Sequence, residues 1–310
     1  LILLASLMLI SVAACSGDEV EESSAELSME ASTESTEQSN DESAAPSVAL
    51  TVPPTASAES GITLPQNIDE KYINAIKTKL DNAPYACAMY YVDLETGLSV
   101  YYNPDRMFAG ASLVKAEYLM MIFEMLENGE LSYDNKYTYN VKRGGTTKIP
   151  YDFKLGDKLT LRQIIEYVVR HSDNTGFYML QVYIRSLYDL GPWAQQRYGT
   201  TFTYRGCNWL NARGVAECWK EIYQKYKEGN EHYTWYVSLL LEANENKFVK
   251  GGLPKDANGE AMYDVAHKYG EDINATNDAA IVFYKDRPYF LCILTDYIGI
   301  YTKSFMNSVS

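Results

Sequence analysis

The chain carries little positive charge, and none of it lies near the N-terminus. Its 310 residues include 27 Lys and Arg against 41 Asp and Glu, and the first basic residue is Lys71. Residues 18–59 hold eleven of these carboxylates, and without them the formal charge changes from −14 to about −3. Nucleic-acid binding needs clustered Lys and Arg that displace counterions. Because no basic stripe is present, we expect no nucleic-acid partner.

Long hydrophobic runs are missing too. The apolar run LILLASLMLISVAA (1–14) is shorter than the roughly 20 residues that a membrane span needs. It ends in VAAC, which resembles the lipobox of bacterial lipoproteins, where the cysteine (here Cys15) becomes lipid-modified. A secretory signal with a small-residue cleavage site is the alternative. We expect residues 1–15 to direct export, and the protein to be extracytoplasmic, either lipid-anchored to the cell membrane or secreted.

Residues 16–62 have few large apolar side chains and are rich in Ser, Glu, Ala and Thr. Such a segment cannot bury enough apolar surface to offset its chain entropy. We predict a disordered tether that holds the rest of the chain some ~35–40 Å from its anchor.

Metal ligands are scarce. The three histidines share no short ligand spacing, and the later cysteines show no metal-type spacing: Cys87, Cys207, Cys218 and Cys292. We therefore expect no metal and no cofactor. Four cysteines allow three disulfide pairings, but Cys87 and Cys292 lie in strand-like runs, and we expect them to be buried free thiols.

Residues 63–310 are predicted to form one domain with two lobes. Helical spacing over 68–83 is followed by two β-rich runs around Gly97, and helical patterns then dominate to about 247 before strands return. A lone hairpin is barely stable, so the sheet portions, 63–105 and 250–310, should pair. We predict an α+β, three-layer α/β/α fold: an antiparallel sheet flanked by terminal helices, with an inserted helical lobe (106–249) and the active site between them.

The stretch FAGASLVKAEYLMM places Ser112 and Lys115 three residues apart at the start of a helix that is apolar on nearly every side. At this spacing the lysine can reach the serine hydroxyl, and burial disfavours its ammonium form, so it can accept a proton. The same spacing occurs by chance about once in a chain of this length. Alone, the pair therefore favours an ordinary helix start over a catalytic pair.

Two further short motifs follow. Ser172, Asp173 and Asn174 interrupt two apolar helical runs, either as a capping turn or as polar groups that face a cleft. Lys268 and Gly270 lie in a strand-like stretch, where the lysine could simply protect a sheet edge and the glycine could allow close approach of a ligand or another backbone.

The order Ser-x-x-Lys, Ser-Asp-Asn and Lys-x-Gly resembles the class A β-lactamases and penicillin-binding proteins. The resemblance covers about residues 63–310 and implies a serine hydrolase that forms an acyl-enzyme on Ser112 with a β-lactam or a D-Ala–D-Ala peptide. Lys115 is then the base, while Ser172 and Lys268 pass the proton to the leaving nitrogen. Substrate contacts are implied for Asn174, Tyr269, Gly270 and Glu271, with the oxyanion hole formed by the backbone N–H groups of Ser112 and Glu271.

Two departures from the family pattern bear on the reaction. Class A enzymes release the acyl group with a glutamate in a Glu-x-x-Leu-Asn segment, but CNWLN (207–211) has Cys207 at that position unless the loop is rearranged. Tyr269 replaces the usual Thr or Ser and could narrow the cleft. We therefore expect slow deacylation in a monomeric β-lactamase-related hydrolase. A penicillin-binding D,D-peptidase and a non-catalytic binder or sensor on the same fold are the alternatives.

Overall fold

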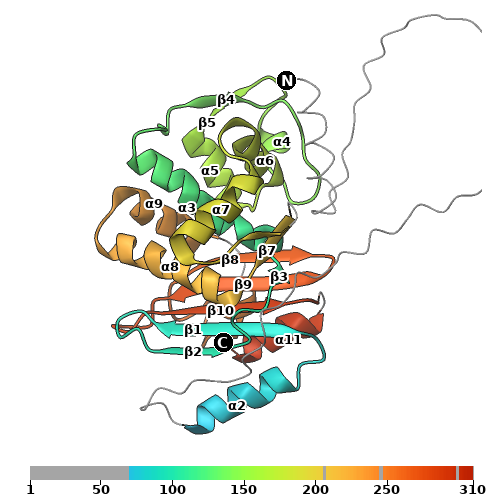
Figure 1. Ribbon diagram of the computed structural model, residues 1–310, viewed down its shortest axis with the longest axis vertical. Coiled ribbons are helices and arrows are strands. Elements are labelled where there is room, and N and C mark those ends of the chain that lie inside the picture. The colour runs from blue at the N-terminus through green and yellow to red at the C-terminus, as the bar shows by residue number, and fades with distance from the viewer. Residues whose placement is uncertain (1–69, 205–206, 244–246, 298–299, 310) are drawn as a thin grey trace, which may run out of the picture.

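The computed structural model describes residues 70–204, 207–243, 247–297 and 300–309, and Figure 1 shows its layered arrangement. The predicted signal segment, Cys15 and the tether lie outside these residues. None of the helices in the described ranges is long and apolar enough to cross a bilayer.

The centre of the fold is a five-stranded sheet in the order β2-β1-β10-β9-β8. All neighbouring strands for which the register is assigned run antiparallel. Its strands, which come from both ends of the described chain, are β1 (Cys87–Asp93), β2 (Ser99–Tyr102), β8 (Val265–Asp272), β9 (Ala275–Val282) and β10 (Tyr289–Thr295). This confirms the predicted pairing of the two sheet portions around an inserted helical segment. Cys87 in β1 and Cys292 in β10 are buried free thiols, as predicted.

Successive side chains of a strand point to opposite faces of this sheet, and each face belongs to a separate hydrophobic core. On one face, Met89, Leu291 and Ile293 pack against three helices. These helices are α2 (Glu70–Asp81), α10 (Phe248–Gly252) and α11 (Ile300–Val309). On the other face, Ala88 and Phe290 join the larger core of the helical lobe. The predicted three-layer α/β/α arrangement is thereby confirmed.

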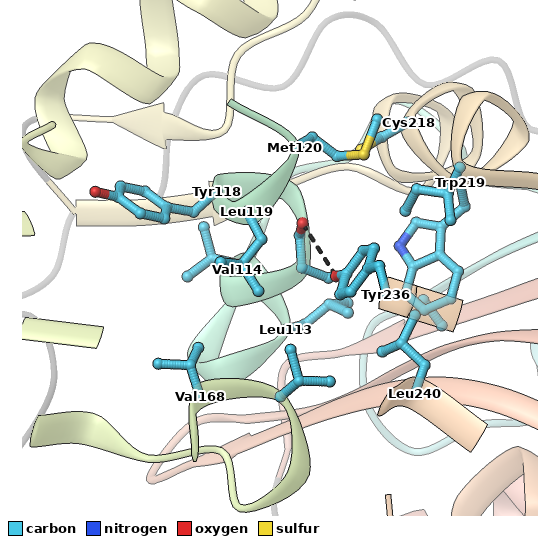
Figure 2. Close-up of a cluster of buried hydrophobic side chains, with 14 of the residues drawn as sticks. Leu113, Val114, Tyr118, Leu119, Met120, Val168, Cys218, Trp219, Tyr236 and Leu240 are labelled. Carbon is cyan, nitrogen blue, oxygen red and sulfur yellow. Dashed lines mark hydrogen bonds between the residues drawn. The ribbon is translucent and has the colours of Figure 1, made fainter. Parts of the chain in front are cut away.

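The helical lobe packs around α3 (Val114–Glu127), of which eleven of fourteen residues are buried. Figure 2 shows the surrounding side chains and the hydrogen bond from the Tyr236 hydroxyl to the Ala116 carbonyl oxygen, 3.3 Å. The other helices are α4 (Ile149–Asp152), α5 (Leu161–Arg170), α6 (Asn174–Tyr183), α7 (Leu187–Tyr198), α8 (Ala212–Lys227) and α9 (Glu231–Leu241). The sequence pattern predicted such a central helix because apolar residues occur all round it.

Short strands also occur in this lobe, which the helical pattern did not predict. A three-stranded sheet combines β3 (Phe108–Ala109), β6 (Thr203–Tyr204) and β7 (Cys207–Leu210), and β4 (Lys136–Thr138) pairs with β5 (Lys158–Thr160). Pairing of β3 with β7 brings residues 207–210 beside the chain that enters α3. This small sheet therefore contributes directly to the site.

Candidate active site

Ser112 lies in the turn that joins β3 to α3. A 3-10 helix, η1 (Ala111–Leu113), leads directly into α3. Ala111, just before the serine, has a left-handed backbone with φ of 46°. Such strain in a residue with a side chain costs of order 1–3 kcal/mol and occurs frequently at active sites. The serine itself is half-buried.

Lys115 lies one turn later, within reach of the serine. Its Nζ is 3.1 Å from Ser112 Oγ, a distance at which a lysine can act as a general base. The side chain is only 3% exposed. Nζ also donates to the Ser172 carbonyl oxygen and to Asn174 Oδ1, each at 2.6 Å. These two acceptors hold the amine beside Ser112.

Ser172 connects the two lysines. It follows α5, is buried, and has a left-handed φ of 52°. Its Oγ accepts a hydrogen bond from Lys268 Nζ at 2.9 Å and lies 3.5 Å from Lys115 Nζ. The three motifs, far apart in the sequence, therefore meet at one chain of polar atoms that runs from Ser112 through Lys115 and Ser172 to Lys268.

Asp173 and Asn174 organise the surrounding loop. Asp173 is fully buried and caps α6, as the capping interpretation predicted, with Oδ1 accepting from Gly176 N at 2.7 Å. It also accepts from the Ile149 N at 2.9 Å and from the Thr147 hydroxyl at 3.1 Å. Asn174 Nδ2 donates to the Gly144 carbonyl oxygen at 3.0 Å. The predicted substrate contact, Asn174, thus also contacts the lysine and the loop.

Gly270 allows strand β8 to touch the start of η1. A Cβ at this position would lie 2.9 Å from Ser112 N, 2.6 Å from Leu113 N and 2.7 Å from the Gly110 carbonyl oxygen. Only glycine fits this close backbone contact. It brings the backbone of Gly270 against that of the nucleophile. The Glu271 side chain pairs with Lys303 of α11 at 3.0 Å.

A cavity of about 280 Å³ opens beside this polar chain and is lined by Thr146, His171, Ser172, Lys268 and Tyr269 among others. No Asp or Glu is among its described lining residues, whereas Lys148, Arg170 and Lys268 are. Burial, followed by the proximity of Lys148, lowers the pKa of His171 below its ordinary value.

Tyr269 forms part of the wall of this cavity. Its ring lies 5.3 Å from that of Phe248 and 5.0 Å from Lys268 Nζ. The bulky substitute for the family's Thr or Ser is therefore packed on α10 and stays in contact with the Lys268 ammonium group.

The segment expected to hold the deacylating glutamate forms strand β7. Asn208 Nδ2 donates to the Ala111 carbonyl oxygen at 3.2 Å, and the Asn208 carbonyl oxygen accepts from Gly110 N at 3.2 Å. Side chains alternate along a strand, so Cys207 lies on the face opposite to Asn208. Asn208, which motif comparison did not single out, is therefore the polar residue of this segment whose side chain contacts the turn that carries Ser112.

Two carboxylates outside β7, Asp189 and Glu117, bear on the deacylating role that the family gives to a glutamate. Asp189 is exposed and accepts from Ser186 N at 2.9 Å in the capping box of α7. Glu117 is fully buried and accepts from Trp219 Nε1 at 3.1 Å. Burial raises the pKa of Glu117 to about 8. Neither carboxylate lines the cavity beside Ser172.

Comparison with known proteins agrees with this geometry. The model of the "Beta-lactamase enzyme family" matches residues 70–304. The chain belongs to this β-lactamase enzyme family. It is a serine hydrolase of the class A β-lactamase-like type. No curated protein matches the sequence.

Solved structures share the β-lactamase fold at low sequence identity. PBP-A is 18% identical, with a TM-score of 0.69 over 84% of this chain and 96% of that chain. A β-lactamase from Chitinophaga pinensis DSM 2588 is 19% identical, with a TM-score of 0.66 over 77% of this chain and 96% of that chain. A point mutant of PBP-A, solved as its acyl-enzyme complex with penicillin G, is 18% identical, with a TM-score of 0.70 over 79% of this chain and 96% of that chain.

Proposed function

We propose that this protein opens β-lactams, or an equivalent amide, through an acyl-enzyme on Ser112 that it hydrolyses slowly. The observation that carries the proposal is the continuous polar chain from Ser112 through Lys115 and Ser172 to Lys268, combined with a neutral Asn208 against the turn that carries Ser112.

Acylation begins with loss of the Ser112 proton. Lys115 Nζ, 3.1 Å from Ser112 Oγ, accepts this proton as the oxygen bonds to the carbonyl carbon. The backbone N–H groups of Ser112 and Glu271 are the expected oxyanion donors. Two observations support this role. Gly270 touches Ser112 N, and β8 is an edge strand with one side unpaired in the sheet.

The C–N bond then breaks, and the nitrogen must gain a proton. Ser172 Oγ can donate its own proton to the leaving nitrogen and recover one from Lys115, which lies 3.5 Å away. The Lys268 ammonium group, 2.9 Å from the same oxygen, stabilises negative charge on Ser172 during the transfer. The proton taken from Ser112 thus ends on the leaving group.

Hydrolysis of the acyl-enzyme needs a base that activates water. An amide such as that of Asn208 cannot accept a proton near neutral pH. We therefore expect the acyl group to persist. A D,D-peptidase that is durably acylated by penicillin is the second candidate, and the same neutral residue favours it.

Intact-mass spectrometry after mixing with benzylpenicillin, together with turnover of a chromogenic β-lactam, tests the proposal. A lasting adduct of one penicillin per chain with slow turnover is expected, and Ser112→Ala should abolish it without changing the melting temperature by more than a few degrees. Rapid turnover without an adduct would show that release is efficient. An adduct that persists in Ser112→Ala would place the nucleophile elsewhere.

We also propose that the protein works outside the cytoplasm, held at the membrane by a lipid on Cys15. The VAAC sequence after an apolar run supports this location. Expression of the full-length protein in a bacterium, followed by membrane fractionation, tests the anchor. Wild-type protein should sediment with membranes and Cys15→Ala should not. Equal sedimentation of both would contradict lipid attachment.

A further inference from the structure

A second cavity lies on the opposite side of the central sheet from Lys268. It measures about 470 Å³ and is lined by Tyr91, Tyr263, Tyr284 and Tyr289 together with Asp93 and Arg287. We call it the tyrosine cavity. It shares no described lining residue with the cavity beside Ser172. Its volume falls in the range of roughly 300–1,000 Å³ typical of small-molecule sites.

The tyrosine cavity forms where four separate segments meet. Tyr91 lies near the end of β1, and Tyr289 begins β10. Tyr284 belongs to the turn between β9 and β10, and Tyr263 to the segment that precedes β8. Three of these rings pack against the core shared by α2, α10 and α11 rather than against the core of the helical lobe. The cavity is therefore fixed by the sheet itself.

The rings form two pairs, and in neither pair are the two ring planes parallel. Tyr91 and Tyr289 lie 5.4 Å apart at 36°, and Tyr263 and Tyr284 lie 4.8 Å apart at 68°. Tyr284 is 37% exposed. A flat heteroaromatic ligand would favour two parallel faces. Rings at these angles instead offer separate apolar surfaces to a ligand that is not flat.

Phenol hydroxyl groups gather in the same place. Burial, with Tyr91, Tyr263 and Tyr284 as neighbours, raises the pKa of Tyr289 to about 12. Burial, followed by nearby Asp93, also raises the pKa of Tyr91. Both phenols therefore stay neutral near pH 7, where each can donate and accept a hydrogen bond.

The guanidinium group of Arg287 adds charged hydrogen-bond donors at the rim of the tyrosine cavity. Asp93 is 2% exposed and accepts from the Glu95 and Thr96 N–H groups at 3.0 and 2.9 Å. Its other oxygen pairs with Arg287, whose side chain is 61% exposed. The buried carboxylate holds Arg287 in place while the remaining N–H groups stay accessible. The Asp93 and Arg287 charges compensate each other, while Lys285 Nζ lies 5.0 Å from the centre of the Tyr284 ring, so hydrogen-bond donors rather than acceptor groups dominate this edge and match the hydroxyl oxygens of a neutral ligand.

We propose that the tyrosine cavity binds a neutral pyranose saccharide. The C–H faces of a pyranose ring pack on aromatic side chains, and its hydroxyls match the phenols and the Arg287 guanidinium group. This site goes beyond the proposed acyl transfer and does not depend on it. The many tyrosines of the sequence have ordinary roles in strands and cores elsewhere, but these four converge on one ligand-sized hollow.

Isothermal titration calorimetry of the full chain with chitotetraose and with maltotetraose tests this site. We expect one of them to bind, and Tyr284→Ala and Tyr263→Ala each to weaken binding about fivefold or more. Tyr151→Ala is the matched control, since Tyr151 is an exposed tyrosine of α4 in the other lobe. It should leave affinity unchanged.

Penicillin labelling of the same variants separates this proposal from the acyl-enzyme. Tyr284→Ala should label at the wild-type rate, which also verifies that it is folded. No binding of either tetrasaccharide at about 5 mM would overturn the proposal. So would binding that both folded tyrosine variants retain at full affinity.

Discussion

Lys115 is a buried amine held by three oxygen-bearing partners, from Ser112, Ser172 and Asn174. Its spacing from Ser112 was readable from the sequence because residues three apart share a helix face. The spacing could not reveal the acceptors from residues 172 and 174, which come from a loop 57 residues later. Only the fold shows that Lys115 is held by Ser112 and also by Ser172 and Asn174.

Substitution of Asn208 tests the proposal that the acyl-enzyme is hydrolysed slowly. Asn208→Glu places a carboxylate beside the chain that leads to Ser112 and should increase the deacylation rate at least tenfold, as a base that activates water. Asn208→Gln changes length without adding a base and should leave the rate within about twofold. Decay of the penicillin adduct, followed by intact mass, gives both rates. Acceleration by Cys207→Glu but not by Asn208→Glu would contradict the orientation of β7.

Glu117 should make stability depend on pH. Its pKa of about 8 exceeds that of an unfolded glutamate, so the folded state holds a proton that the unfolded state releases. This contribution is fully present below about pH 4.5 and is lost as pH rises to about 8. Glu117→Gln cannot ionise, so its melting temperature should rise relative to wild type between pH 5 and pH 8.5. A constant difference across this range would contradict a raised pKa.

At the scale of elements, the long periodic segments were predictable and the short ones were not. The strands around Gly97, the central α3 and the closing α11 all follow from hydrophobic periodicity. Strand β3 has two residues and β7 has four, too few for a pattern to emerge. Their existence depends on pairing with each other across about 100 intervening residues. For this reason motif spacing could only align Cys207 with the family's glutamate, and it could not show that Asn208 contacts the Ala111 carbonyl oxygen.

The loop from Gly144 to Ile149 shows the same limit. Nothing in its sequence marks a site. Yet the Thr147 hydroxyl and the Ile149 N–H donate hydrogen bonds to Asp173, and the Gly144 carbonyl oxygen accepts one from Asn174 Nδ2. Asp173 was expected only as a helix cap or as part of a motif. In the fold it joins the start of α6 to this loop, of which Thr146, Thr147 and Lys148 line the cavity.

Asp173→Asn should therefore destabilise the protein by about 2–3 kcal/mol, because the amide nitrogen cannot accept the bonds that one carboxylate oxygen accepts. Asp189→Asn is the matched control in an exposed capping box and should cost less than about 1 kcal/mol. Urea unfolding of both variants measures the difference. Equal losses would show that the buried contacts of Asp173 contribute no more than an ordinary exposed cap.

At the scale of the whole molecule, basic side chains gather beside the proposed active site although the net charge is negative. The protein is strongly acidic, yet Lys148, Arg170 and Lys268 line the cavity beside Ser172. Lys148 pairs with Asp152 at 2.9 Å and Arg170 with Glu242 at 2.6 Å, so carboxylates outside the cavity walls offset two of these charges. The overall composition led us to expect no nucleic-acid partner, but it could not show that these basic side chains gather beside Ser172.

The central claim is that acylation of Ser112 outpaces release of the acyl group. Stopped-flow hydrolysis of a chromogenic β-lactam at substrate excess measures both steps in one trace. The account predicts a rapid burst with an amplitude of about one product per enzyme, followed by a steady state at least tenfold slower, and no burst for Ser112→Ala. Product that forms linearly with time from the start, without a burst, would contradict it.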